Sequence, residues 1–219
     1  EYFQCSNCGF VQTEEPYWLD EAYSEAIASS DVGMLSRSTM FSTAANNIIF
    51  NLFDHSAKFL DYGGGYGVFV RMMRDLGFYF FWHDKYCQNI FAQGFEADEN
   101  SSYSYELVTA FEVFEHFVKP LVELEKIFKF SRNILFSTKL LPANNPKPNE
   151  WWYYALDEGQ HISIYTSKAL SIIAEKFNLK FYSNGDSLHL FTDKEIQPQL
   201  FQSLSSYKEP ELKKPSLLQ

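Results

Sequence analysis

The most informative stretch of this 219-residue chain reads Phe59-Leu60-Asp61-Tyr62-Gly63-Gly64-Gly65-Tyr66-Gly67-Val68-Phe69. An apolar run that ends in an acidic residue and then in glycines predicts a buried strand, a tight turn and a helix. Glycine is needed at such a turn because the backbone bends sharply and a ligand must approach it without meeting a Cβ. A glycine-rich loop alone is shared by proteins that bind nicotinamide, flavin or S-adenosylmethionine cofactors.

Two acidic residues narrow the choice of cofactor. Asp61 stands at the end of the predicted strand, and Asp84 ends the next apolar run, Phe78–His83. A dinucleotide places its pyrophosphate at the helix N-terminus, where a leading carboxylate would repel it. S-adenosylmethionine instead carries an ammonium and a sulfonium, which a carboxylate attracts. Asp84 is placed to accept hydrogen bonds from a ribose, which suits either cofactor. Asp61 therefore favours S-adenosylmethionine.

Beyond this loop, strand-like and helix-like segments alternate along the chain. Such alternation predicts an α/β fold with a doubly wound, mostly parallel sheet covered by helices on both faces. Asn184-Gly185 between two apolar runs predicts a closing antiparallel hairpin. The expected strands are 58–61, 78–83, 106–111, 133–138, 179–182 and 188–192, and the expected helices are 68–76, 85–92, 121–130 and 167–176.

The segment before the first strand carries two apolar stripes with helical spacing, over 17–28 and 40–53. These helices are expected to cap the mouth of the following domain. The chain is accordingly divided into residues 1–15 as a candidate zinc-ribbon remnant, 16–54 as a helical cap, 55–195 as the cofactor-binding catalytic domain and 196–219 as a C-terminal tail. The charged segment 208–214 within that tail is expected to be solvated.

Cys5 and Cys8 form a Cys-x-x-Cys pair followed by Gly9, which is how one knuckle of a zinc ribbon reads. A structural zinc site needs four ligands. The second pair would therefore have to precede Glu1, and an incidental Cys-x-x-Cys stays open as the alternative. Cys87, the third cysteine, is expected to be a packing residue.

Composition excludes several classes of protein. The formal net charge is −10 without a cluster of Lys and Arg, which argues against a nucleic-acid substrate. No apolar run approaches the roughly 20 residues that span a bilayer, and no signal peptide is visible. Three cysteines do not form a disulfide framework. The expected location is therefore cytoplasmic, away from nucleic acids and membranes.

Three motifs together resemble class I S-adenosylmethionine-dependent methyltransferases. They are the stretch 59–69, the acidic strand end at Asp84, and residues 105–120, which include Glu112-Val113-Phe114-Glu115-His116. The third motif and the aromatic segment 151–165 are most similar to a bacterial small-molecule branch, and the likeness covers about residues 15–193. The resemblance implies a Rossmann-like sheet of seven strands. Some relatives, including sugar C-methyltransferases, carry a four-cysteine zinc module, whose second half Cys5 and Cys8 would match.

The resemblance also implies which residues contact the cofactor. Asp61, Gly63 and Gly65 would surround the methionine end, and Asp84 would bind the ribose. Asp98 would lie at the adenine edge. The residues that would border the methionine portion and the transferring methyl group are Phe111 and Glu112.

Methyl transfer from a sulfonium is an in-line displacement, so the protein mainly positions donor and acceptor. A general base is needed where the acceptor is a hydroxyl or a carbon acid. His116 follows the strand 106–111 at the edge where ligands bind; its alternative role is a structural hydrogen bond to the cofactor loop. His161 follows an Asn- and Pro-rich loop whose aromatic residues, Tyr154 among them, would wall the acceptor, or would merely cover the core. His116, His161 and Tyr154 are the catalytic candidates.

Glu112 and His116 are four residues apart and would share one face of a helical turn, a spacing that a metal site could also use. Two ligands on one turn, with no third nearby in the sequence, make a metal the less favoured interpretation.

The sequence thus predicts an S-adenosylmethionine-dependent methyltransferase, of the EC 2.1.1 type, acting on a small molecule such as a sugar or a precursor of a glycan or secondary metabolite. That substrate class rests on the resemblance alone. A catalytically inactive binding module of the same fold stays open, although the intact Asp61 and Asp84 disfavour it. A nicotinamide-dependent oxidoreductase is a weaker alternative because of Asp61. The expected partners are a methyl acceptor and, as an open option, a second copy of the chain.

Overall fold

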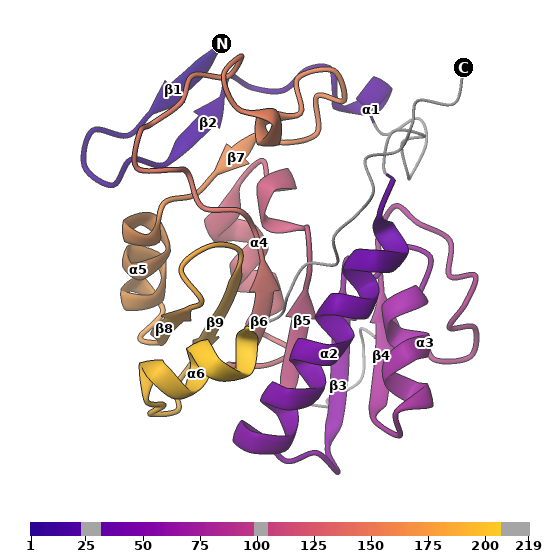
Figure 1. Cartoon of the computed structure of the whole chain (residues 1–219). Coiled ribbons are helices and arrows are strands. Elements are labelled where there is room, and N and C mark those ends of the chain that lie inside the picture. Colours follow the sequence, from indigo (N-terminus) through magenta and orange to yellow (C-terminus); the bar gives the residue numbers. More distant parts are fainter. Residues whose placement is uncertain (23–31, 99–104, 207–219) are drawn as a thin grey trace.

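The computed structural model describes residues 1–22, 32–98 and 105–206, and its centre is a six-stranded sheet with the order β4-β3-β5-β6-β9-β8 (Figure 1). The four strands β4, β3, β5 and β6 run parallel, and β9 pairs antiparallel with both β6 and β8. This confirms the expected mostly parallel sheet with a closing antiparallel hairpin. The strands are β3 (Lys58–Tyr62), β4 (Tyr79–His83), β5 (Leu107–Ala110), β6 (Ile134–Ser137), β8 (Lys180–Ser183) and β9 (Leu188–Thr192).

The main sheet has six strands in the described residues, whereas the family resemblance implies seven. The difference lies beside β4, where only one further bridge is formed. The Trp82 N–H donates to the Phe95 carbonyl and the Ala97 N–H donates to the Trp82 carbonyl, each at 2.8 Å. These two bonds form a single parallel bridge between Trp82 and Glu96, at the position where a further edge strand would begin. One bridge is too short to count as a strand. Residues 99–104, which follow, lie outside the described residues.

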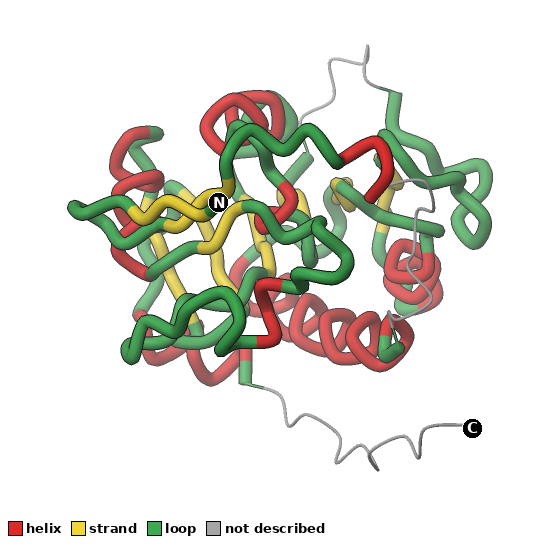
Figure 2. Tube along the Cα trace, turned by 90° about the horizontal axis from the view of Figure 1, so that it is seen from above, coloured by secondary structure: helices red, strands yellow, loops and turns green. Residues whose placement is uncertain are grey.

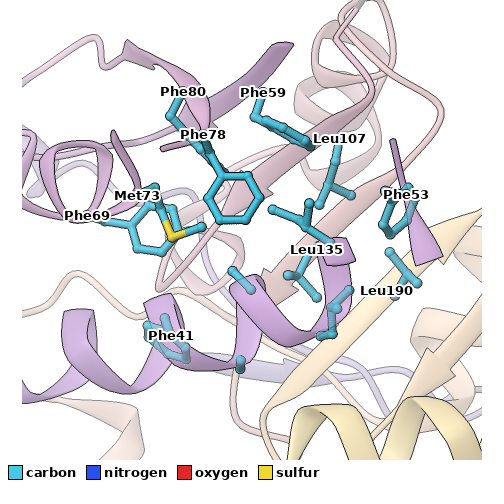
Figure 3. Packing of buried hydrophobic residues seen from close by; sticks show 14 of the residues in the cluster. Phe41, Phe53, Phe59, Phe69, Met73, Phe78, Phe80, Leu107, Leu135 and Leu190 are labelled. Carbon is cyan, nitrogen blue, oxygen red and sulfur yellow. The ribbon is translucent and has the colours of Figure 1, made fainter. Parts of the chain in front are cut away.

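Successive residues of the central strands point to opposite faces, and both faces are buried. Phe59 and Leu107 lie in one hydrophobic cluster, whereas their neighbours Leu60 and Val108 lie in another, and all four are fully buried. Figure 3 shows the first cluster, in which strand side chains meet those of helices such as Phe41 and Met73. The continuous apolar runs of these strands are therefore explained by helices on both sides.

Of the helices in the described residues, five cover the two faces of the sheet. The first face is covered by α2, α3 and α6, and the second by α4 and α5 (Figure 1). The Thr166 hydroxyl caps α5 by accepting a hydrogen bond from the Ala169 N–H, and Pro120 begins α4 where its missing N–H is harmless. The described helices are α1 (Leu19–Ala22), α2 (Met34–Leu52), α3 (Val68–Asp75), α4 (Pro120–Ile127), α5 (Ser167–Lys176) and α6 (Pro198–Ser205).

The N-terminal helix α2 is part of the core. Ala45, Ile48 and Ile49 are fully buried against the sheet, so most of this helix forms one of its covering layers. Its first half reaches the carboxyl edge of the parallel strands, where the Phe41 ring stacks on Phe111 at a centroid distance of 4.4 Å. Of the other expected helix, 17–28, only α1 is described, because residues 23–31 lie outside the described residues.

The segment 196–219 begins with structure that packs on the domain. Phe201 of α6 is fully buried and belongs to the same cluster as α2. The expected solvated segment 208–214 lies outside the described residues.

The predicted helix over 85–92 is wrong. Both side-chain oxygens of Asp84 accept hydrogen bonds from backbone N–H groups. Oδ1 accepts from Tyr86 (2.7 Å) and Cys87 (2.8 Å), and Oδ2 accepts from Gly65 (2.9 Å). Asn89 then accepts from the Ala92 N–H at 2.9 Å. Asp and Asn side chains that bond nearby backbone groups replace the helical pattern with turns.

A second, three-stranded sheet lies above the carboxyl edge of the main one, as Figures 1 and 2 show from two directions. Its order is β1 (Tyr2–Gln4), β2 (Val11–Thr13) and β7 (Ser163–Ile164), all antiparallel. Hydrogen bonds fix it to the chain after β5: the Gln12 side chain donates to the Val118 carbonyl and the Ser163 hydroxyl to the Phe117 carbonyl, each at 2.7 Å. The N-terminal hairpin, formed by β1 and β2, therefore covers the edge of the main sheet at which ligands bind in such folds.

Candidate active site at the carboxyl edge of the sheet

The glycine loop between β3 and α3 is fixed by its backbone. The Gly63 and Gly64 N–H groups both donate to the His83 carbonyl, at 2.8 and 3.1 Å. Gly63 has a φ of 73°, and a Cβ there would stand 2.6 Å from Cγ2 of Val113. A Cβ on Gly64 would stand 2.8 Å from the Trp82 ring. Close packing therefore favours glycine at both positions, and the positive φ favours it at Gly63 as well.

Gly65 differs, because a Cβ there would meet nothing within 4 Å. Its N–H donates to Oδ2 of Asp84 at 2.9 Å, and its carbonyl accepts from the Trp82 indole at 2.8 Å. Asp84 follows the end of β4, as the sequence predicted, and this hydrogen bond holds it against the loop. The space beside Gly65 is open to a ligand.

Asp61 is almost fully buried, with 3% of its surface exposed. Its Oδ1 accepts a 2.6 Å hydrogen bond from the Thr109 hydroxyl of β5. The pKa of Asp61 is raised to about 7, mainly by burial; the Thr109 hydrogen bond opposes this shift and the charge of Asp84 adds to it. A cation beside this carboxyl would favour its ionised form.

Two other residues that were expected to contact the cofactor, Phe111 and Asp98, have different surroundings. The ring of Phe111 packs between Phe41 and Phe69, at 4.4 and 5.0 Å between centroids, so it belongs to the hydrophobic layer below the edge. Asp98 is exposed and immediately precedes the residues that are not described. Their cofactor roles stay predictions.

Glu112 follows β5 with a φ of 54°, which is unusual for a residue with a side chain. Ser137 of β6 holds it, because its hydroxyl accepts from the Glu112 N–H at 2.7 Å and donates to Glu112 Oε1 at 2.5 Å. Burial and the neighbouring Glu115 raise the pKa of Glu112 to about 7, against smaller opposing effects that include Arg37 and His161. Strained, partly buried acids of this kind are frequent at functional sites.

Glu115, His116 and His161 meet above this strand end. Glu115 lies on a short 3-10 turn (Phe114–His116) and is fully buried, and its Oε1 accepts a 2.8 Å hydrogen bond from the Tyr153 hydroxyl. Its Oε2 is buried without a hydrogen-bond partner. The His116 and His161 rings are edge to face, 5.0 Å apart. The structure therefore brings together two of the catalytic candidates, 45 residues apart in sequence.

Backbone carbonyls orient both histidines. Nδ1 of His116 lies 3.0 Å from the Gln160 carbonyl, and Nδ1 of His161 lies 2.6 Å from the Tyr153 carbonyl. The pKa of His116 is lowered to about 3, mainly by burial and also by His161, and the carbonyls of Gln160 and Glu112 oppose this shift. His116 is therefore neutral at neutral pH and is a weak proton acceptor.

Tyr154, the third catalytic candidate, is not brought to this cluster. It is buried among Val11, Ile164 and Tyr2 beneath the small sheet, and its hydroxyl contacts the Pro146 carbonyl at 3.4 Å. Its neighbour Tyr153 reaches Glu115 instead. Tyr153, Glu115 and Ser137 are residues that sequence reasoning missed. Glu115 stood inside the quoted motif, but nothing in the sequence showed that it is buried.

Cys5 and Cys8 lie on one tight turn of the N-terminal hairpin. The Cys5 N–H donates to the Phe10 carbonyl at 2.8 Å, and the Gly9 N–H donates to the Cys5 carbonyl at 2.9 Å. Hydrogen bonds from the Cys8 and Asn7 backbone lower the pKa of the exposed Cys5 thiol. This geometry is compatible with half of a zinc site, and zinc stays a prediction.

The comparisons with known proteins agree with this arrangement. A family model described as a methyltransferase domain matches residues 36–184. The chain therefore belongs to this methyltransferase family. Its fold is that of the class I S-adenosylmethionine-dependent methyltransferases. No curated protein sequence matches the chain.

Solved structures share the fold at low sequence identity. Magnesium protoporphyrin IX methyltransferase from Synechocystis PCC 6803, solved with SAH, aligns with a TM-score of 0.53 and 13% identity over 80% of this chain and 92% of its own. A putative methyltransferase in complex with the Haloferax volcanii Trm112 activator aligns with a TM-score of 0.57 and 14% identity, over 80% and 98%. TnmH gives 0.53 and 15%, over 82% of this chain but only 62% of TnmH. No described helix has the length and apolarity to cross a membrane.

Proposed function

We propose that this chain transfers the methyl group of S-adenosylmethionine to a small molecule at the carboxyl edge of the parallel strands. The observation that carries the proposal is the arrangement of the buried Asp61, the open Gly65 and the Asp84 carboxylate around one loop. It offers carboxyl groups beside an open space. This is the pattern that suits a cofactor with cationic groups and a ribose.

In this proposal Asp61, Gly63 and Gly65 surround the methionine end, and Asp84 binds the ribose. Asp84 already accepts from the Gly65 N–H through Oδ2, so a ribose would share an acceptor that the loop has oriented. Asp98 would lie at the adenine edge, and the backbone of Phe111 and the side chain of Glu112 would border the methyl group. Val113 supports this placement, because it packs against Gly63.

The acceptor would lie beside Glu112, His116 and His161. A small molecule is favoured because the net charge of −10 opposes a nucleic acid. A sugar or a precursor of a glycan or secondary metabolite remains our proposal on the resemblance. A cytoplasmic location is proposed from the three free thiols.

Calorimetry with S-adenosylmethionine, its demethylated product and NAD tests the cofactor. We expect the first two to bind and NAD not to bind, and Asp84→Ala to weaken binding while the fold is retained by circular dichroism. Binding of NAD alone would refute the proposal. A binding module of the same fold is distinguished by turnover, because it would bind the cofactor without transferring tritiated methyl to any member of an acceptor panel.

A further inference from the structure

We infer that Glu115, His116 and His161 form a binding site for one divalent transition-metal ion, with Zn²⁺ as the reference ion. Each side chain offers one ligand atom, and these atoms lie within 4.8 Å of one another. Ligand atoms around one ion at about 2.0–2.2 Å are separated by roughly 3–4 Å, so small side-chain rotations would close the site. The inference concerns metal binding and does not require the proposed methyl transfer.

The first independent observation is the buried oxygen of Glu115. Oε1 accepts from the Tyr153 hydroxyl at 2.8 Å, but Oε2 has no partner although the side chain is fully buried. Buried carboxyl oxygens are almost always paired or bound to a metal, because losing water without compensation is unfavourable. A cation between Glu115 and the two imidazoles would supply the missing partner.

The second observation is the orientation of the His161 ring. A backbone carbonyl can only accept, so the Tyr153 carbonyl, 2.6 Å from Nδ1, places the proton of the neutral His161 ring on Nδ1. In this tautomer Nε2 of His161 carries the lone pair. Metal-binding histidines typically donate their other ring N–H to a carbonyl or carboxylate in this way, which fixes the ring and makes it a better ligand.

The ligand set selects the kind of ion. Two imidazoles and one carboxylate suit Zn²⁺ and similar transition metals, whereas Mg²⁺ and Ca²⁺ prefer oxygen ligands throughout. Glu112 lies near the same cluster, since its carboxyl interacts electrostatically with both Glu115 and His161. Three protein ligands leave coordination positions open, as in sites where a metal binds an exchangeable ligand.

The cluster lies close to the cofactor loop, so an acceptor could bind at the open coordination position of the ion. Glu115 and His116 follow Val113, which packs against Gly63 of the cofactor loop. An acceptor oxygen bound to the ion would therefore lie at the same strand end as the expected methyl group, and the ion would lower the pKa of a hydroxyl. On the proposed function, this favours hydroxyl-bearing acceptors and makes His116 and His161 ligands rather than proton acceptors.

Equilibrium dialysis of the full chain against Zn²⁺ tests the site. Cys5→Ser with Cys8→Ser is the starting protein, so that thiolates do not contribute. We expect one Zn²⁺ per chain. His161→Ala and Glu115→Gln should each weaken binding at least about a hundredfold, because loss of an outer partner alone costs 10- to 100-fold. Tyr153→Phe should fall within that smaller range, and His55→Ala, an exposed histidine outside the cluster, should bind as the starting protein does.

Cobalt substitution gives a readout that does not depend on the variants folding. Co²⁺ bound to the unmutated chain at this site should give visible bands of nitrogen and oxygen ligation, unchanged by Cys5→Ser with Cys8→Ser. A thiolate charge-transfer band as the only signal, or Zn²⁺ binding unaffected by His161→Ala, would overturn the inference, as would absence of binding to the cysteine-free protein. Calorimetry with S-adenosylmethionine on the metal-free protein keeps this outcome separate from the cofactor proposal.

Discussion

The buried carboxyl group of Asp61 makes a quantitative prediction about how S-adenosylmethionine binding depends on pH. Burial raises the pKa of Asp61 to about 7, so about half of the free molecules carry its proton at pH 7. The cofactor brings an ammonium and a sulfonium, which favour the ionised carboxylate. Binding should therefore release about half a proton at pH 7.

The same reasoning fixes the sign and size of the affinity change. If only the ionised form binds, the apparent association constant is proportional to the ionised fraction of Asp61. This fraction rises from about 0.1 at pH 6 to about 0.9 at pH 8. Affinity should thus increase about tenfold over this range. The stability of the free protein should change in the opposite direction: because the folded pKa of Asp61 lies above its ordinary value of 3.8, its contribution falls by up to about 4 kcal/mol as pH rises from about 4 to above 7.

Isothermal calorimetry in buffers with different ionisation enthalpies measures the released protons directly. Asp61→Asn is the matched control, because it keeps the size of the side chain and can still meet the Thr109 hydroxyl, but it cannot titrate. We expect weaker binding and no proton release from this residue in the variant. Equal proton release by Asp61→Asn and the unmutated chain would refute the reasoning, since the proton would then come from the ligand or another group.

Three further predictions test the site and the fold. Gly65→Ala should weaken S-adenosylmethionine binding far more than it lowers the free energy of unfolding, because a Cβ there meets nothing in the free protein; Gly94→Ala, equally open with a positive φ, is the control and should leave binding unchanged. Glu112→Gly should be about 1 kcal/mol more stable in urea denaturation than Glu112→Ala, because φ is 54° and both variants lose the carboxylate; equal stabilities would contradict the strain. Phe201→Ala, at a fully buried position of α6, should cost about 3–5 kcal/mol by the same measurement, and a cost below 1 kcal/mol would show that α6 is not part of the core.

The core of the fold could be predicted because its signals are local. The strand before Asp61, the glycine turn and the helix after it lie in one short stretch, and α5 begins and ends at the residues expected from its pattern. The Asn184-Gly185 turn likewise joins β8 and β9 as expected. Each of these elements is specified by its own residues, so tertiary contacts had little to add.

The errors arose where side chains compete with the backbone or where pairing is marginal. The alternation of strands and helices placed a helix over 85–92 and gave no sign that Asp84 and Asn89 would bond to nearby N–H groups and form turns. In place of a seventh strand, the described residues form one bridge, between Trp82 and Glu96. An edge strand needs several consecutive backbone hydrogen bonds to its neighbour, and the family resemblance alone does not guarantee them.

The acceptor end of the site illustrates the deeper limit. Sequence spacing put Glu112 and His116 on one helical face and found no third ligand nearby. In the structure Glu112 leaves the helical region with a φ of 54°, and the residue that faces His116 is His161, which arrives from the loop before β7. That loop is held there by β7 pairing with β2 and by the Ile162 N–H bond to the Glu115 carbonyl. The N-terminal hairpin, although remote from the glycine loop in sequence, therefore helps to build the cluster at which we expect the metal and the acceptor to bind.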